Sequence, residues 1–187
     1  LNQILVKFTT TAVAAFGAYF KLQSFIFMPV FGMNNGIVPI IAYNYGAQNR
    51  KRLNEAMRLA AIYGIVIMTM GMFIFWAIPH VLLGFFAASP ELMRIGTVEL
   101  RSISLVFPFA WYSIMRGGVF QALGKSVYSM YVSIVRQLIV LLPAAYFLSK
   151  LGNVDYVWFS FVFEEFFGLS MSIIYTRKIK KDIISQL

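Results

Sequence analysis

The chain alternates long apolar runs with short polar segments. Residues 59–88 carry no formal charge, and residues 102–115 are apolar or hydroxylic throughout. An α-helix rises about 1.5 Å per residue, so about 20 such residues cross the hydrocarbon core of a bilayer. The pattern therefore predicts an all-α, polytopic transmembrane helical bundle of about five full spans preceded by a partial one. The expected spans are residues 14–45, 59–86, 100–123, 127–148 and 156–176.

The composition also indicates a membrane environment. Hydrophobic residues make up 60% of the chain and charged residues 12%, whereas soluble domains carry about 25% charged residues. The connecting segments are short, so we expect one helical bundle without an inserted soluble domain. The first residue is Leu1 and the number of full spans is odd, so we expect residues 1–187 to be the carboxyl part of a longer protein.

Lysine and arginine are shared unequally between the two sets of span ends. Nine lie at the ends that include the carboxyl terminus, and five lie at the opposite ends. Cytoplasmic loops carry the excess of basic residues, so we expect a multi-pass protein of the plasma (inner) membrane with a cytoplasmic carboxyl terminus. Topology and contact with the headgroups of the lipid bilayer explain the net charge of +9, and we expect no nucleic-acid partner.

The first span contains amides and helix breakers in an apolar background. Asn34 and Asn35 lie between Pro29 and Pro39, next to Gly36. Each proline removes a helical hydrogen bond and frees a carbonyl, so we expect the helix to break around Pro29, Gly36 and Pro39. The two amides either line a water-filled substrate cavity or only hold a kinked helix against its neighbours.

The third span contains Tyr112 and Arg116 close to its polar end at Gln121. The long Arg116 side chain could extend toward the cytoplasmic headgroups while its methylene groups stay in the membrane. Otherwise Arg116 and Tyr112 line the substrate cavity. Both interpretations remain open from the residues alone.

The fourth span carries a polar stripe of three serines followed by Arg136 and Gln137, which we take as a further cavity candidate. Arg136 is ten residues into the span, or about 15 Å deep. Glu164 and Glu165 lie at nearly the same depth in the antiparallel fifth span. A charge inside a membrane needs a partner, so we expect Arg136 to form a buried charge pair or a proton relay with one glutamate. Adjacent helical residues point about 100° apart, so the other glutamate should be protonated or face a cavity.

Residue types that bind metals or catalyse reactions are scarce. The chain has no cysteine and a single histidine, His80, so we expect no metal site. It has no nucleotide-binding P-loop and no common hydrolase motif, so we expect neither enzyme activity nor a cofactor. Any transport would be driven by an ion gradient.

Several segments, in this order, resemble the carboxyl lobe of multidrug and toxic compound extrusion (MATE) transporters. They are FGMNNGIVPIIAYNYGAQNRKRLNEA, ELMRIGTVELRSISLVFPF, FQALGKSVYSMYVSIVRQ, LPAAYFLSKLG and VWFSFVFEE. The resemblance implies two six-helix lobes around a central cavity. Residues 1–187 would form the end of helix seven and helices eight to twelve, and the missing amino-terminal lobe would be a partner. The implied activity is antiport, in which drugs or toxic organic small molecules leave in exchange for protons or sodium ions.

The resemblance also assigns family positions to particular residues. The Arg-Gln pair of helix eleven falls on Arg136 and Gln137, and the glutamate of helix twelve falls on Glu165 by alignment. Some members hold a coupling carboxylate in helix ten, where this chain has Glu99 at the expected outer lip and Arg116 inside. A cavity arginine disfavours cationic substrates. A lipid-linked oligosaccharide flippase is therefore one alternative, and a structural membrane bundle or channel is another.

Overall fold

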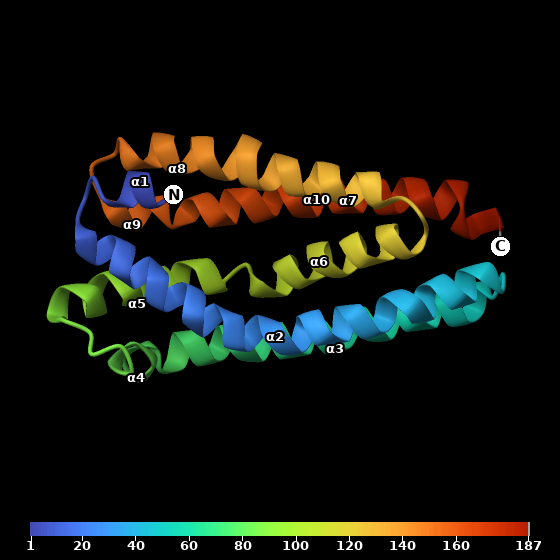
Figure 1. Ribbon diagram of the computed structural model, residues 1–187, viewed down its shortest axis with the longest axis horizontal. Helices are drawn as coiled ribbons and strands as arrows, with labels where there is room; N and C mark the ends of the chain where they lie inside the picture. The colour runs from blue at the N-terminus through green and yellow to red at the C-terminus, as the bar shows by residue number, and fades with distance from the viewer. Residues whose placement is uncertain (187) are drawn as a thin grey trace.

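The computed structural model describes residues 1–186, which form a bundle of helices with no strand among them. The long helices run lengthwise, and the chain reverses at alternating ends of the bundle (Figure 1). Helices α2 and α3 lie side by side on one side, α7, α8 and α10 lie on the other, and α5 and α6 run between them. The carboxyl terminus, the α2–α3 connection and the α6–α7 connection share one end.

Helix α2 (Thr10–Gly46) is one continuous helix of 37 residues. It begins after Thr9, whose hydroxyl accepts a hydrogen bond from the backbone N–H of Thr11. The expected break at Pro29, Gly36 and Pro39 does not interrupt α2, which continues through all three positions and changes direction along its length (Figure 1). Each proline removes only one backbone hydrogen bond, and the turns on either side keep theirs. At about 1.5 Å per residue the helix is about 56 Å long and extends beyond a hydrocarbon core of about 30 Å.

The second expected span is divided between two helices. Helix α3 (Arg50–Ala77) is capped by the Asn49 side chain, which accepts from the backbone N–H of Arg52 at 3.1 Å. A short helix, α4 (Pro79–Gly84), follows. Pro79 donates no hydrogen bond back to α3 and is well suited to the first turn of a new helix, so α4 begins there. The spanning segment therefore ends about nine residues earlier than the apolar run predicts.

The third span begins earlier than expected and is bent. Helix α5 (Pro90–Ser104) is capped by Ser89, whose hydroxyl accepts from the N–H of Leu92. Helix α6 (Phe107–Ala122) follows at an angle of 52°. Pro108 lies in the first turn of α6 and cannot donate a hydrogen bond back to α5, which accounts for the bend at this place.

The last two spans run antiparallel to each other. The first is made of α7 (Ser126–Ile134), a π-helical segment η1 (Val135–Leu141) and α8 (Leu142–Ser149). The second is made of α9 (Val154–Val157) and α10 (Phe159–Asp182). The short elements α1 (Asn2–Leu5) and η2 (Ile184–Gln186) lie at the two chain ends. Among residues 1–186, four helical segments are long and apolar enough to cross a membrane, or five when the bent pair counts as one span, which confirms the predicted fold class.

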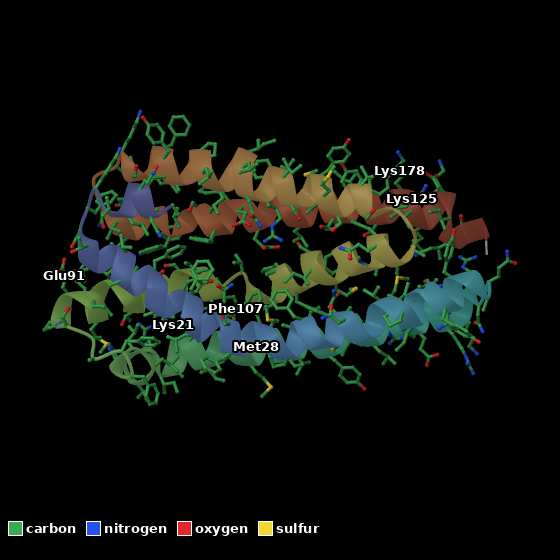
Figure 2. The ribbon with its side chains drawn as sticks, in the orientation of Figure 1. Lys21, Met28, Glu91, Phe107, Lys125 and Lys178 are labelled. Carbon is green, nitrogen blue, oxygen red and sulfur yellow. The ribbon has the colours of Figure 1, made fainter. Side chains whose placement is uncertain are left out.

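Aromatic side chains fill the core, whereas the outer surface is apolar and open. Trp111 is fully buried and donates from its indole N–H to the carbonyl of Ala60 on α3. Phe107 lies inside the bundle, while Met28 points away from it (Figure 2). Many large hydrophobic side chains are exposed in the same way, among them Phe85 at 79% and Phe25 at 74%. Such a surface is stable only against lipid or another apolar protein surface.

Candidate functional site

A buried ion cluster joins the last two spans. The guanidinium of Arg136, in the π-helical segment η1, lies 2.6 Å from Glu165 and 3.1 Å from Glu164, both on α10. The expectation that only one glutamate would face Arg136 was wrong, because both carboxylates contact it. The planar guanidinium has five N–H donors in a fork, and this fork is wide enough to span two successive positions of one helix.

Gly168 lets Arg136 lie flat against α10. A methyl group added at Gly168 would come within 2.8 Å of Cγ and 2.9 Å of Nε of Arg136. Those distances are shorter than ordinary contacts between heavy atoms, so a larger residue would push the arginine off the helix. Gly168 is one turn beyond Glu164, and the arginine therefore runs along α10 toward its two partners.

Ser113 ties the cluster to a third helix. Its hydroxyl, on α6, donates a hydrogen bond of 2.7 Å to Oε1 of Glu165. One guanidinium and two carboxylates together carry a formal charge of −1 when all three are ionised. Because an unneutralised charge inside a membrane is costly, this arrangement favours one further positive charge at the cluster.

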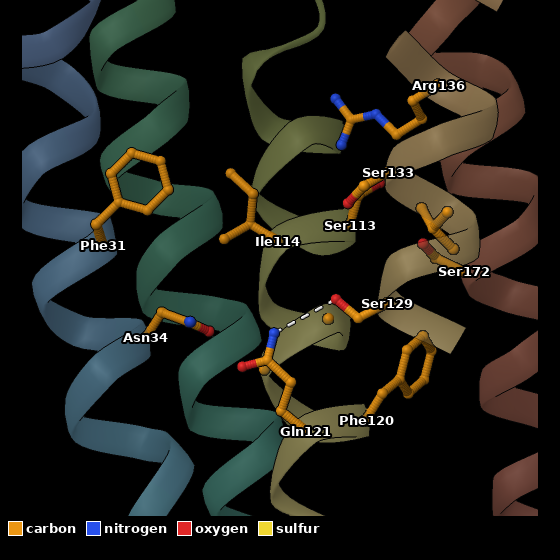
Figure 3. Close-up of a pocket in the computed structure, with 13 residues that line it drawn as sticks. Phe31, Asn34, Ser113, Ile114, Phe120, Gln121, Ser129, Ser133, Arg136 and Ser172 are labelled. Carbon is orange, nitrogen blue, oxygen red and sulfur yellow. Dashed lines mark hydrogen bonds between the residues drawn. The ribbon is translucent and has the colours of Figure 1, made fainter. Parts of the chain in front are cut away.

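A polar cavity of about 220 Å³ adjoins the cluster between α2, α6, α7 and α10. Figure 3 shows Asn34 on the α2 side, with Ser129, Ser133 and Arg136 on the opposite side. The Asn34 carbonyl oxygen is buried and has no hydrogen-bond partner within residues 1–186. Gln121 donates to Ser129 at 3.4 Å across the cavity wall. The cavity thus offers an amide oxygen and several hydroxyl groups to a polar ligand or to water.

The structure separates the predicted cavity residues. Asn34 and Arg136 share the cavity just described, whereas Tyr112 and Arg116 line a different hollow between α3, α6 and α10. Asn35 and Gln137 are exposed and line neither hollow. The breaker residues are likewise exposed along α2; they are Pro29, Gly36 and Pro39.

Glu99 is a buried acid whose predicted position at the outer lip was wrong. It is fully buried, and neither carboxylate oxygen has a hydrogen-bond partner among the described residues. Glu99 was expected at the outer lip because the third span was predicted to begin at Leu100, whereas α5 begins at Pro90. The Ser89-Pro90 pair is a helix-start signal that would have placed Glu99 inside the helix. Tyr19 of α2 is also buried.

Within residues 1–186, no group of three or more acidic, histidine or cysteine side chains is arranged to hold a metal ion. Long apolar helices around a buried ion cluster define an α-helical, multi-pass integral membrane protein. A model of the MatE family matches residues 2–147. The chain therefore belongs to the MatE family of membrane transporters.

Known proteins share both its sequence and its fold. The multidrug export protein MepA of Staphylococcus haemolyticus is 24% identical over 180 residues, which cover 95% of this chain and 39% of that protein. MepA of Staphylococcus aureus is 25% identical over 175 residues, covering 93% of this chain and 38% of that protein. The chain spans about two fifths of the length of these curated relatives.

The solved structure of the MATE multidrug transporter DinF-BH superimposes with a TM-score of 0.81 and 25% identity, over 92% of this chain and 38% of that one. An outward-facing MATE family transporter of the MOP superfamily superimposes with a TM-score of 0.87 over the whole of this chain and 42% of that one. At 18% identity the second likeness concerns the fold alone.

Proposed function

We propose that this chain is the carboxyl-terminal lobe of a secondary antiporter that exports drugs or toxic organic compounds in exchange for protons or sodium ions. In this proposal residues 1–187 form the end of helix seven and helices eight to twelve, and an amino-terminal lobe is the missing partner. The proposal is supported by membership of the MatE family and by the multidrug export activity that the names of its relatives state. It is also supported by length, since the chain covers about two fifths of these relatives.

The ion cluster beside the cavity is the observation that carries the proposal. Arg136 contacts two carboxylates, so the ionised cluster has a formal charge of −1 and can bind one further positive charge. A proton, a sodium ion or a cationic compound would neutralise it, and binding of one would weaken binding of another. Competition of this kind at a single site is what couples the entry of an ion to the exit of a substrate.

The same geometry favours the antiporter over the flippase alternative. A flippase for lipid-linked oligosaccharides needs free cationic groups in its cavity to bind phosphate. Here Arg136 is held by two glutamates, and Arg116 lines a different hollow. The polar cavity therefore carries no unpaired arginine among the residues that line it.

The basic residues at the ends of the spanning helices support a plasma-membrane protein with a cytoplasmic carboxyl terminus. Figure 2 shows Lys125 and Lys178 at the end where the carboxyl terminus lies, and Lys21 and Glu91 toward the opposite end. The connections alternate between these ends as the charge pattern requires. In this orientation the α2–α3 connection and the α6–α7 connection are both cytoplasmic.

Ion-driven efflux of a cationic dye tests the proposal. The chain would be expressed with its amino-terminal lobe, and efflux from membrane vesicles measured under an imposed proton or sodium gradient. Glu164→Gln with Glu165→Gln should abolish gradient-driven efflux, whereas Glu55→Gln, at an exposed position on α3, should leave it unchanged. Full gradient-driven efflux by the folded double variant would overturn the assignment of the ion cluster.

A further inference from the structure

A second hollow, of about 550 Å³, lies between α3, α6 and α10. It is distinct from the polar cavity, because the two use different faces of α6. The polar cavity is lined by Ser113 and Gly117, whereas this hollow is lined by Tyr112 and Arg116. Successive helical residues are about 100° apart, so the mean directions of the two sets of lining residues differ by about 135° around the α6 axis. We call this second hollow the basic hollow.

The basic hollow brings cations together from three helices. Arg58 comes from α3, Arg116 from α6, and Arg177 and Lys180 from α10, while none of the described acidic residues lines the space. None of the four takes part in the ion pairs found within residues 1–186. Four like charges around one space repel one another, so an anion bound among them would stabilise the fold.

Hydrogen-bond donors and acceptors at the basic hollow are also unused. The Nε–H of Arg116 is buried and has no partner among the described residues, and the same holds for the Thr176 hydroxyl. The remaining contacts of the Arg116 guanidinium are weak ones, with the Met57 sulfur at 3.7 Å and the Tyr112 ring at 4.8 Å. Arginine forms its strongest hydrogen bonds with phosphate and carboxylate groups, and here that capacity is free.

The basic hollow lies near the end of the bundle that holds the carboxyl terminus, where the headgroups of a bilayer are expected. Arg58 is eight residues into α3, or about 12 Å from its start, and Arg177 is five residues, or about 8 Å, from the end of α10. The wall also contains apolar side chains, among them Ala61, Ile62 and Ile173. A ligand here would have its anionic group among the basic side chains and an apolar part against the wall.

We propose that the basic hollow binds the phosphate group of an anionic phospholipid. The phosphate accepts hydrogen bonds from Arg116 and its basic neighbours, and the acyl chains lie along the apolar wall toward the membrane interior. Basic pockets between spanning helices at a membrane surface bind lipid headgroups in this way. The site lies away from the proposed transport cavity, so its role is to join α3, α6 and α10 through a bound lipid.

Lipid-dependent stability tests the proposal. The protein with its amino-terminal lobe would be incorporated into nanodiscs of phosphatidylcholine, with or without phosphatidylglycerol, and its thermal unfolding measured. Phosphatidylglycerol should raise the unfolding temperature. Arg116→Gln and Lys180→Gln should each weaken the lipid's apparent affinity about tenfold, as expected for one lost charge-assisted hydrogen bond. Lys178→Gln is the control, since it removes the same charge from an exposed position on α10 outside the hollow.

Three outcomes would overturn the proposal. Equal stabilisation by both lipids would show that no anionic lipid is bound. An equal loss in Lys178→Gln would show that only the overall surface charge matters. If inorganic phosphate, added to phosphatidylcholine nanodiscs, stabilised the protein as much as phosphatidylglycerol, the site would be one for a soluble phosphate instead. If Arg116→Gln does not fold, Lys180→Gln decides the question, because Lys180 is exposed near the end of α10.

Discussion

Replacing Gly168 with alanine should displace Arg136 from both glutamates. The added methyl group would lie 2.8 Å from Cγ of Arg136, and closer still to Cδ. Ordinary contacts between carbon atoms are about 3.5–4.0 Å, so the side chain must move by about 1 Å. A movement of that size lengthens the 2.6 Å contact with Glu165 beyond the range of a hydrogen bond.

The expected loss of stability follows from this movement. Overpacking in a close-packed interior costs about 1–3 kcal/mol, and removing one partner of a buried ion pair costs about 3–5 kcal/mol. Gly168→Ala should therefore destabilise the folded state by about 1–3 kcal/mol, and Arg136→Ala by about 3–5 kcal/mol. Unfolding of the purified protein in detergent, followed by circular dichroism, would measure both changes. Gly17→Ala is the control, because a methyl group there meets no atom within 4 Å.

The double variant separates this mechanism from a general effect on α10. When Arg136 is already alanine, no long side chain crosses Gly168 and the added methyl group has nothing to displace. The double variant should then be no less stable than Arg136→Ala alone, a non-additivity that a double-mutant cycle measures directly. Additive losses, or a Gly168→Ala variant as stable as the wild type, would refute the contact between Gly168 and Arg136.

Three further predictions concern packing, the unpartnered acid and topology. Gly64→Ala should lower the free energy of unfolding by about 1–3 kcal/mol, because the new methyl group would overlap the buried ring of Trp111; a stable variant would contradict this packing. Glu99→Gln should leave thermal stability unchanged or raise it, since an amide carries no charge to bury; a large loss would mean that the carboxylate has a partner. Cysteines at the exposed positions Ser126 and Leu151 should react with a membrane-impermeant thiol reagent from opposite sides, because they lie at opposite ends of the bundle.

The sequence determined which segments span the membrane and that Arg136, Glu164 and Glu165 lie at a common depth. Apolar runs alone place the spanning helices, because about 20 residues are needed to cross the bilayer core. Depth along a helix follows from a rise of about 1.5 Å per residue. This calculation was enough to predict that Arg136 lies at the same depth as Glu164 and Glu165. In the structure Arg136 contacts both glutamates.

Helix ends were predicted less well, because an apolar run does not mark where a helix begins or ends. The third span starts at Pro90, ten residues before the predicted start at Leu100, and the second ends at Ala77 within its apolar run. The local signals were a serine cap in one case and a proline in the other. The early start of α5 is what buries Glu99.

Only the tertiary structure decided the direction in which each polar side chain points around its helix. Apart from the amphipathic α5, the spanning helices are apolar on most sides, so a hydrophobic stripe does not mark the face that packs inward. Arg116 and Ser113 are three residues apart on α6, yet one lines the basic hollow and the other bonds to Glu165. That difference depends on how α6 is packed between α3 and α10, which is a relation between segments far apart in the sequence. Depth is a local property of one helix, whereas orientation around its axis is set by the neighbours that pack against it.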